Sequence, residues 1–282
     1  MTKQSNPDDV STIRGEISGD GRLTFGERLA YLRRNAWRNL RAKRSSLRAV
    51  FYRPEGVSQI TTPSSPSRAQ TMAFLEHRLK DMVPEKGARI LDIGCGSGFM
   101  SDVFAECGLT GDYTGIDIQD RVRETFAHPE AFDRTFIEAD AHTFETDQSF
   151  DLLFSFSALE HIPDDGKLLQ HLDGMLKETG AHLHIVPAGW GLPVYLWHGF
   201  RQYTLGDIED RFGRENVNVY ALGGVFSFLL HFIFITVFEM ILRVPVRKWF
   251  RSLYLVLLRF SLRADRFVPV APVAYVVHKT KS

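Results

Sequence analysis

The chain has 282 residues, and its 34 basic and 34 acidic side chains give a formal net charge of zero. Because 44% of the residues are hydrophobic and 24% are charged, the composition excludes a disordered, collagen-like or coiled-coil chain. Only Cys95 and Cys107 are present, which excludes a disulfide framework and favours the cytoplasm.

The neutral sum conceals an uneven distribution of charge. Residues 76–178 hold 22 acids and 9 bases, a net charge of −13. Residues 28–48 hold eight Lys and Arg residues without an acid, and residues 241–264 hold six without an acid. The sequence therefore predicts an acidic centre between two basic flanks that favour an anionic partner.

Residues 1–22 mix Gly, Ser and Asp without periodicity, which predicts a disordered tail. Residues 23–68 are expected to form a basic helical extension and a Pro/Ser-rich linker, ITTPSSPSR at 60–68. In the extension, apolar residues recur at spacings of three and four between arginines: Leu29, Leu32, Ala36 and Leu40. This pattern predicts a basic amphipathic helix that packs either on the protein core or on a membrane surface.

Residues 69–282 are expected to form one α/β domain that begins with a helix over 69–82. From residue 88, short β-type runs alternate with helical segments, among them 166–176 and 204–212. The predicted strands are 89–93, 113–118, 134–139, 150–156, 181–186 and 274–279. Such alternation implies βαβ units. We predict a doubly wound, mostly parallel, Rossmann-like sheet, with the basic helical extension before it and an apolar helical insertion before its last strand.

A glycine-rich turn follows the first predicted strand, where residues 90–98 read ILDIGCGSG. Glycines permit a tight turn and the close approach of a ligand to the backbone. The G-x-G-x-G spacing differs from the G-x-G-x-x-G of dinucleotide enzymes, and the Lys of a P-loop is absent. Residues 92–98 (DIGCGSG) instead resemble the first motif of class I S-adenosylmethionine-dependent methyltransferases, and the resemblance extends over about residues 69–212 and the last strand.

This resemblance implies S-adenosylmethionine as the cofactor and assigns roles to positions after the later strands. Asp117 would bind the ribose hydroxyls, Ile118 would pack on the adenine, and Asp140 would accept a hydrogen bond from the adenine amino group. Residues 150–161 resemble the fourth motif, whose end would face the reactive methyl group. The predicted cofactor site comprises Asp92, Gly94, Cys95, Gly96, Gly98, Asp117, Ile118, Asp140, Ala141 and Ser157.

Methyl transfer from a sulfonium is a direct displacement, which requires alignment of the acceptor and benefits from a base. The candidates are polar groups after the fourth and fifth strands, because ligands of open α/β sheets bind there: Ser157, Glu160, His161, His184 and His198. We predict His161 and His198 as the catalytic pair, with Arg201 and Tyr203 as further acceptor contacts. Packing of the pocket and its loop is the alternative role of these residues.

Some members of the family, small-RNA 2′-O-methyltransferases among them, bind a metal through Glu-x-x-Glu-His and a later His. Ser157 occupies the first Glu position here, so one ligand is missing and we expect no metal site.

Residues 219–264 form the predicted apolar and basic insertion. Its first twenty residues, 219–238, carry no charge and are long enough to span a bilayer. The next apolar run, 253–258, is too short to cross back, although 274–279 must rejoin the sheet. We therefore expect an interfacial or re-entrant helical hairpin with basic residues on anionic headgroups. A lid or a dimer interface is the alternative.

These features together predict a cytoplasmic methyltransferase, peripheral on the inner face of the membrane. Its favoured acceptor would be an oxygen of a lipid, quinone or lipid-linked glycan precursor, with a nitrogen or carbon as the less favoured acceptor atom. A soluble methyltransferase of a small metabolite or RNA remains an alternative, as does a catalytically silent cofactor-binding partner docked on the membrane. Nucleic acid is disfavoured as a partner because aliphatic rather than aromatic residues interleave the second basic stretch. The sequence leaves the acceptor and the oligomeric state open.

Overall fold

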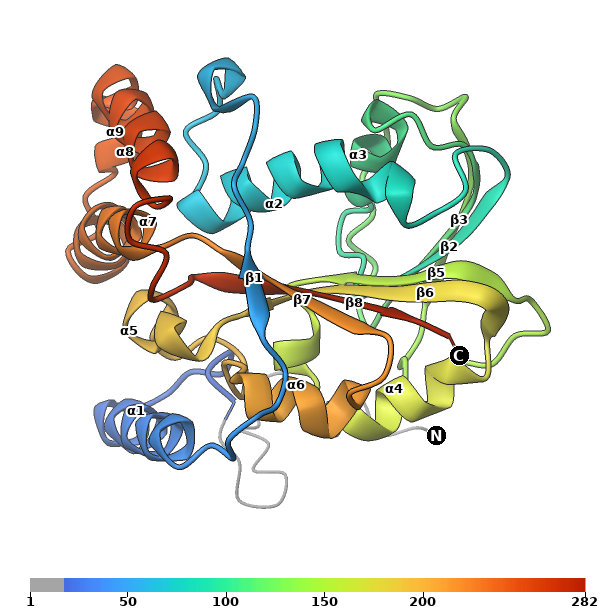
Figure 1. Cartoon of the computed structure of the whole chain (residues 1–282), viewed down its shortest axis with the longest axis horizontal. Coiled ribbons are helices and arrows are strands. Elements are labelled where there is room, and N and C mark those ends of the chain that lie inside the picture. Colours follow the sequence, from blue (N-terminus) through green and yellow to red (C-terminus); the bar gives the residue numbers. More distant parts are fainter. Residues whose placement is uncertain (1–17, 282) are drawn as a thin grey trace.

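The computed structural model describes residues 18–281, which fold around one eight-stranded sheet (Figure 1). The strands are β1 (Ala49–Phe51), β2 (Ala88–Ile93), β3 (Gly111–Asp117), β4 (Phe132–Glu138), β5 (Phe150–Phe156), β6 (Leu176–Pro187), β7 (Val217–Leu222) and β8 (Ala274–Thr280). Their order in the sheet is β1-β7-β8-β6-β5-β2-β3-β4. All run parallel except β8, which is antiparallel to its neighbours β6 and β7.

Helices cover both faces of this sheet (Figure 1). Helices α2 (Pro66–Arg78) and α3 (Met100–Glu106) pack on one face, and α4 (Asp165–Asp173) and α6 (Leu205–Phe212) pack on the other. A cluster of buried apolar side chains lies on each face, as expected for a doubly wound sheet. The predicted α/β class is therefore confirmed, and all the predicted strands are present, with β6 longer than expected.

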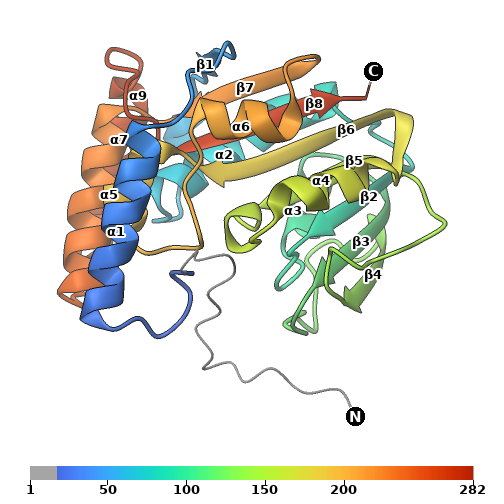
Figure 2. The same ribbon diagram turned by 90° about the horizontal axis from the view of Figure 1, so that it is seen from below.

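The remaining helices gather at one end of the molecule (Figures 1 and 2). They are α1 (Phe25–Leu40), α5 (Leu192–Tyr195), α7 (Val225–Leu230), α8 (Val246–Trp249) and α9 (Arg251–Ala264). Helix α7 continues into a π-helix, His231–Ile241, and α7 packs against α9, so this segment forms a helical hairpin. Its interfacial or re-entrant place at a membrane stays a prediction. None of the described helices is both long and apolar enough to cross a membrane.

Several predicted boundaries were wrong. The extension 23–68 is not separate from the sheet, because its strand β1 pairs with β7. Strand β7 occupies the start of the predicted insertion, so the helical part begins only at α7. Helix α2 starts inside the predicted linker, where Ser65 caps it and Pro66 takes its first position. Residues 18–22 of the predicted disordered tail make specific contacts, whereas residues 1–17 lie outside the described part of the chain.

A buried ionic network joins α4, α6 and the loop that follows α5. Asp165, which is 2% exposed, pairs with Arg201 at 2.9 Å and with Arg211 at 2.6 Å. The Tyr203 hydroxyl donates a third hydrogen bond to Asp165 at 2.5 Å. Arg201 also donates to the carbonyls of residues 162 and 163. The network therefore fixes the loop over residues 196–203 against the segment that follows β5.

We expect Asp165→Ala to lower the free energy of unfolding by about 3–5 kcal/mol, because it leaves buried Arg201 without its counterion. Chemical denaturation measures this loss. The control is Asp147→Ala at an exposed loop position, where a change within about 0.5 kcal/mol is expected. Equal stability of the Asp165 variant and the wild type would contradict a structural role for the network.

Candidate active site

A cavity of about 650 Å³ lies at the carboxyl ends of β2, β3, β4 and β5. This is the edge at which open parallel sheets bind their ligands. Many of the predicted site residues line it: Gly94, Gly96, Asp117, Ile118, Asp140, Ala141, Ser157 and His161. Sequence reasoning did not select other lining residues: Asp20, Gln119, Arg121, His142, Ile162 and Pro163.

The glycine turn after β2 is shaped by hydrogen bonds to β3. The N–H groups of Gly94 and Cys95 both donate to the carbonyl of Ile116, at 2.8 and 3.1 Å. Gly94 has φ +70°, and a Cβ there would lie 2.6 Å from the Cβ of Ala158, so only glycine fits. The Gly96 N–H donates to Asp117 Oδ2 at 2.9 Å. The turn and the carboxylate of Asp117 are therefore positioned together.

The lining groups fit an S-adenosyl cofactor. A Cβ at Gly96 would meet no atom within 4 Å, so the space beside this backbone is open to a ligand. The side chain of Ile118 is 69% exposed and offers an apolar surface beside Asp117. Asp140 Oδ1 accepts the N–H of His142 at 2.9 Å, which holds this carboxylate at the cavity wall. An apolar side chain and two carboxylates that line one cavity suit the adenine ring, the ribose hydroxyls and the adenine amino group of the cofactor.

Three predicted cofactor residues do not line the cavity. Asp92 is 1% exposed and accepts a hydrogen bond from the Tyr113 hydroxyl. Burial, together with the charge of Asp117, raises the pKa of Asp92 to about 7. Burial also raises the pKa of the Cys95 thiol to about 12, and a Cβ at Gly98 would lie 2.6 Å from the Phe136 ring. These residues therefore shape the turn next to the cavity, and their predicted contact with the cofactor stays a prediction.

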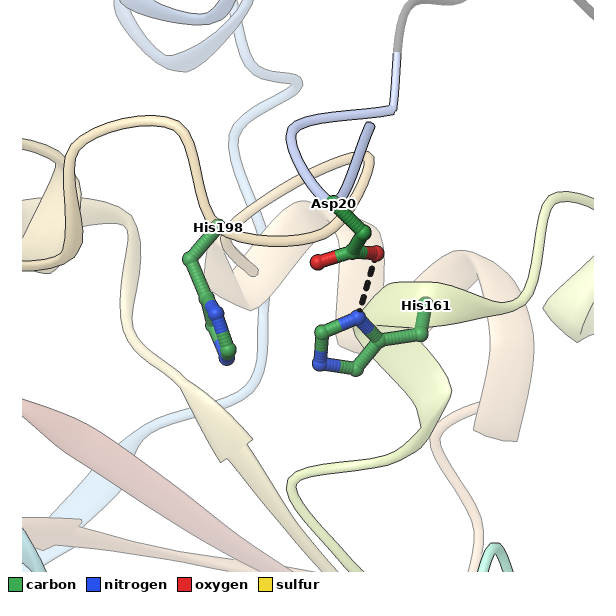
Figure 3. Close-up of side chains that lie close together, drawn as sticks. All are labelled: Asp20, His161 and His198. Carbon is green, nitrogen blue, oxygen red and sulfur yellow. Dashed lines mark hydrogen bonds and ion pairs between the residues drawn. The ribbon is translucent and has the colours of Figure 1, made fainter. Parts of the chain in front are cut away.

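The two predicted catalytic histidines lie side by side, with Asp20 beside His161 (Figure 3). Their ring centroids are 4.5 Å apart, and His161 Nδ1 hydrogen-bonds to Asp20 Oδ2 at 2.6 Å. Glu160 is fully buried beneath them, with Oε1 3.7 Å from His198 Nε2 and 4.0 Å from His161 Nε2. Within the described chain, neither carboxyl oxygen of Glu160 has a hydrogen-bond partner.

These acids change the protonation of His161. Burial acts to lower the pKa of His161, but the hydrogen bond to Asp20 and the charges of Glu160 and Asp20 outweigh it. The pKa therefore lies above its usual value of 6.5. Since Nδ1 is engaged by Asp20, Nε2 is the ring nitrogen that can exchange a proton with a ligand.

Contacts between distant segments hold this group together. The Gly19 N–H donates to the Gly199 carbonyl at 2.7 Å, and the Gly199 N–H donates to Asp20 Oδ1 at 3.3 Å. The Phe200 N–H donates to the Glu160 carbonyl at 2.7 Å, and the Tyr31 hydroxyl donates to the His198 carbonyl at 3.0 Å. Sequence reasoning missed Asp20 because no local pattern marks a contact made 141 residues away.

Asp20, His161 and His198 also form a group whose ligand atoms lie within 4.8 Å of one another and could hold a metal ion. The expectation of no metal rested on Ser157 in the place of a Glu, and the structure instead brings in Asp20. That expectation therefore stays a prediction.

Three further candidates are wrong as site residues. His184 is fully buried within the sheet, where its Nδ1 hydrogen-bonds to Ser155 Oγ at 2.8 Å. Burial and nearby His182 hold the pKa of His184 well below its usual range. Arg201 and Tyr203 belong to the buried network around Asp165 rather than to the cavity.

A second cavity of about 190 Å³ adjoins the first, and Ser157 lines both. Ser157 has φ +50°, a strained conformation that non-glycine residues adopt mainly at functional sites. Among the other lining residues are Phe156, Tyr195, Arg68 and the fully buried Thr71. The Thr71 hydroxyl has no hydrogen-bond partner in the described structure, so the cavity offers it to a ligand. The Arg68 guanidinium lies 4.5 Å from the ring centroid of Phe99.

A family model described as a methyltransferase domain matches residues 67–219. The chain belongs to this family. It is an S-adenosylmethionine-dependent methyltransferase, as its first motif and cavity indicated.

Curated relatives agree. The chain is 26% identical over 211 residues to a ubiquinone biosynthesis O-methyltransferase of Paramagnetospirillum magneticum. The match covers 71% of the chain and 82% of that protein. It is 29% identical over 122 residues to the protein of the same name from Hydrogenovibrio crunogenus, covering 41% of the chain and 46% of that protein. The chain thus spans about half the length of the second relative. The solved structure of coclaurine N-methyltransferase with N-methylheliamine and SAH is 13% identical to this chain, and the match covers 92% of this chain and 88% of that protein. Its TM-score of 0.50 shows the shared fold.

We expect Asp117→Ala to weaken the binding of S-adenosylhomocysteine roughly 10- to 100-fold, because hydrogen bonds to a charged group contribute about 1.5–3 kcal/mol. Isothermal titration measures the change. Asp120→Ala, at an exposed position outside the cavity, is the control and should bind like wild type. Equal affinities of the Asp117 and Asp120 variants would refute the assignment of this cavity to the cofactor.

We expect Asp20→Asn to lower the pKa of His161, because the variant loses the negative charge that favours the imidazolium. The acidic limb of a pH–rate profile governed by unprotonated His161 would then move to lower pH. NMR titration of the His161 ring measures the pKa directly, with Asp147→Asn as a remote control. An unchanged titration would show that Asp20 does not contact His161 in solution.

Proposed function

We propose that this methyltransferase transfers the methyl group of S-adenosylmethionine to a phenolic oxygen of an aromatic, quinone-type acceptor. The observation that carries the proposal is the second cavity, which shares Ser157 with the cofactor cavity. Its volume of about 190 Å³ suits a single ring, since a cavity of roughly 150 Å³ holds benzene. The name that the relatives carry, ubiquinone biosynthesis O-methyltransferase, supports the same acceptor class.

The groups that line the second cavity suit an oxygenated ring. Phe156 and Tyr195 offer aromatic surface, and the unpartnered Thr71 hydroxyl can hydrogen-bond to a ring oxygen. The guanidinium of Arg68 is the cation that would stabilise a phenolate or a ring carboxylate. An acceptor that lacked these oxygens would leave the polar groups unpaired, which disfavours a purely aliphatic acceptor.

Bound S-adenosylmethionine supplies an electrophilic methyl group, so the protein must align the acceptor and remove its proton. His161 lines the cofactor cavity, and its Nε2 is the proposed base. Asp20 holds Nδ1 and stabilises the imidazolium formed when the phenol proton reaches Nε2. His198 packs against the His161 ring and restricts its orientation. The raised pKa of His161 predicts that its activity as a base develops above pH 6.5.

The test supplies purified protein with S-adenosylmethionine and a catechol bearing a ring carboxylate, and follows O-methylated product by mass spectrometry. Arg68→Met should lower kcat/KM roughly 10- to 100-fold, because it removes a charge-assisted hydrogen bond of about 1.5–3 kcal/mol. Arg89→Met, at the start of β2 on the opposite edge of the sheet, is the control and should match wild type.

No transfer to any catechol by a protein that binds S-adenosylhomocysteine normally would overturn the proposal. Full activity of the Arg68 variant would remove the second cavity from the acceptor site.

A further inference from the structure

Helix α1 turns its apolar stripe away from the protein. Phe25, Leu29 and Leu40 are 81%, 59% and 82% exposed, and Trp37 is also exposed. The side that faces the protein is polar instead: Tyr31, Arg38 and Asn39 donate hydrogen bonds to the carbonyls of residues 198, 202 and 189. A helix that packed on the core would bury its apolar stripe. The apolar stripe of α1 is therefore largely exposed and can contact a bilayer or another protein.

The helical hairpin after β7 presents a second apolar surface. In α9, Tyr254, Leu258 and Leu262 are buried against the protein. Other apolar side chains of α8, α9 and the turn between them are exposed: Trp249, Phe250, Leu253, Val256 and Phe260. The end of the π-helix adds exposed Met240, Ile241 and Leu242. This hairpin is apolar on two sides, and only one of them is covered by the protein.

These surfaces lie at the same end of the molecule. Figure 1 places α1, α7, α8 and α9 at one end of the sheet, with α5 between α1 and α7. Scattered exposed apolar residues are ordinary, but a set of this size gathered at one end of the molecule indicates an interaction surface.

Basic residues border the apolar side chains. Exposed cations accompany both helical segments: Arg33, Arg41, Arg44, Arg243, Lys248, Arg251 and Arg263. Residues 28–48 and 241–264 contain no acid, and the nearest acid before the second stretch, Glu239, is paired with Arg247 at 2.5 Å. Aromatic and aliphatic side chains beside unopposed cations are the composition of helices that lie in the headgroup region of anionic bilayers.

We propose that α1 and the α8–α9 hairpin form a membrane-docking face that binds the surface of an anionic bilayer without crossing it. A second copy of the chain is the competing occupant. In a twofold dimer the same face would meet itself, which would oppose one set of cations to another. Charge complementarity therefore favours anionic lipid.

The docking face connects directly to the acceptor side of the active site. Through Tyr31, α1 holds the carbonyl of His198. The π-helix holds the segment of α5, because Thr236 donates to the Val194 carbonyl at 2.5 Å and His231 packs on Tyr195 of the second cavity. Docking would thus place the acceptor cavity next to the bilayer. The docking face rests on exposure and charge alone, so it stands whether or not the acceptor is a quinone.

The experiment uses the full-length protein and co-sedimentation with vesicles of phosphatidylcholine alone or of phosphatidylcholine with about 30% of the anionic lipid phosphatidylglycerol. We expect binding to the anionic vesicles, weaker binding to the neutral ones, and loss of binding as salt screens the cations. The triple variants Leu29→Ser/Trp37→Ser/Leu40→Ser and Leu253→Ser/Val256→Ser/Phe260→Ser should each lower the partition coefficient at least about tenfold.

The control is Val50→Ser/Ile137→Ser, which removes exposed apolar side chains on β1 and β4 and should bind vesicles like wild type. Titration with S-adenosylhomocysteine checks that every variant is folded. Absence of wild-type binding to anionic vesicles would overturn the proposal. So would a dimer, measured by analytical ultracentrifugation, that the same triple substitutions dissociate while vesicle binding persists. Either result leaves the assay for catechol methylation untouched.

Discussion

The site depends on the way the turn after β2 is fastened to β3. Two consecutive N–H groups, of Gly94 and Cys95, converge on one carbonyl of Ile116, and the next glycine N–H engages the Asp117 carboxylate. A side chain at Gly94 is excluded by the proximity of Ala158. Because parallel strands end at a common edge of the sheet, the topology alone places the ends of β4 and β5 beside the turn. The cofactor half of the site thus follows from a short segment and from topology.

The acceptor half is built in a different way, by contacts between segments far apart in the chain. The loop with His198 has little regular structure. It is held by Tyr31 and Gly19 and by the buried Asp165 network, while the π-helix holds the preceding helix α5. A loop fixed by side chains and tail contacts can change its sequence without disturbing the sheet.

The sequence predicted the strands and the glycine turn well and the contacts around His198 poorly, for physical reasons. Strands and the glycine turn are marked by local alternation and spacing, whereas β1 is only three residues long. Strand β7 was hidden because its apolar residues merge with α7 into a single uncharged run. Arg201 and Tyr203 were misplaced because a polar residue looks the same in sequence whether it pairs with a buried acid or faces a ligand. The contact of Asp20 with His161 has no local signature at all.

The orientation of α1 relates the first basic stretch of the sequence to an exposed surface of the protein. Side chains on its polar face donate hydrogen bonds to backbone carbonyls of the loop around His198. Its apolar stripe and several of its arginines therefore face outward together. A helix bound through apolar contacts would have had no such stripe to offer. The basic flank is thus joined to the acceptor loop by α1, while the acidic centre surrounds a pocket for a cationic cofactor. The neutral sum therefore conceals two regions of opposite charge, one around the cofactor cavity and one on the proposed docking face.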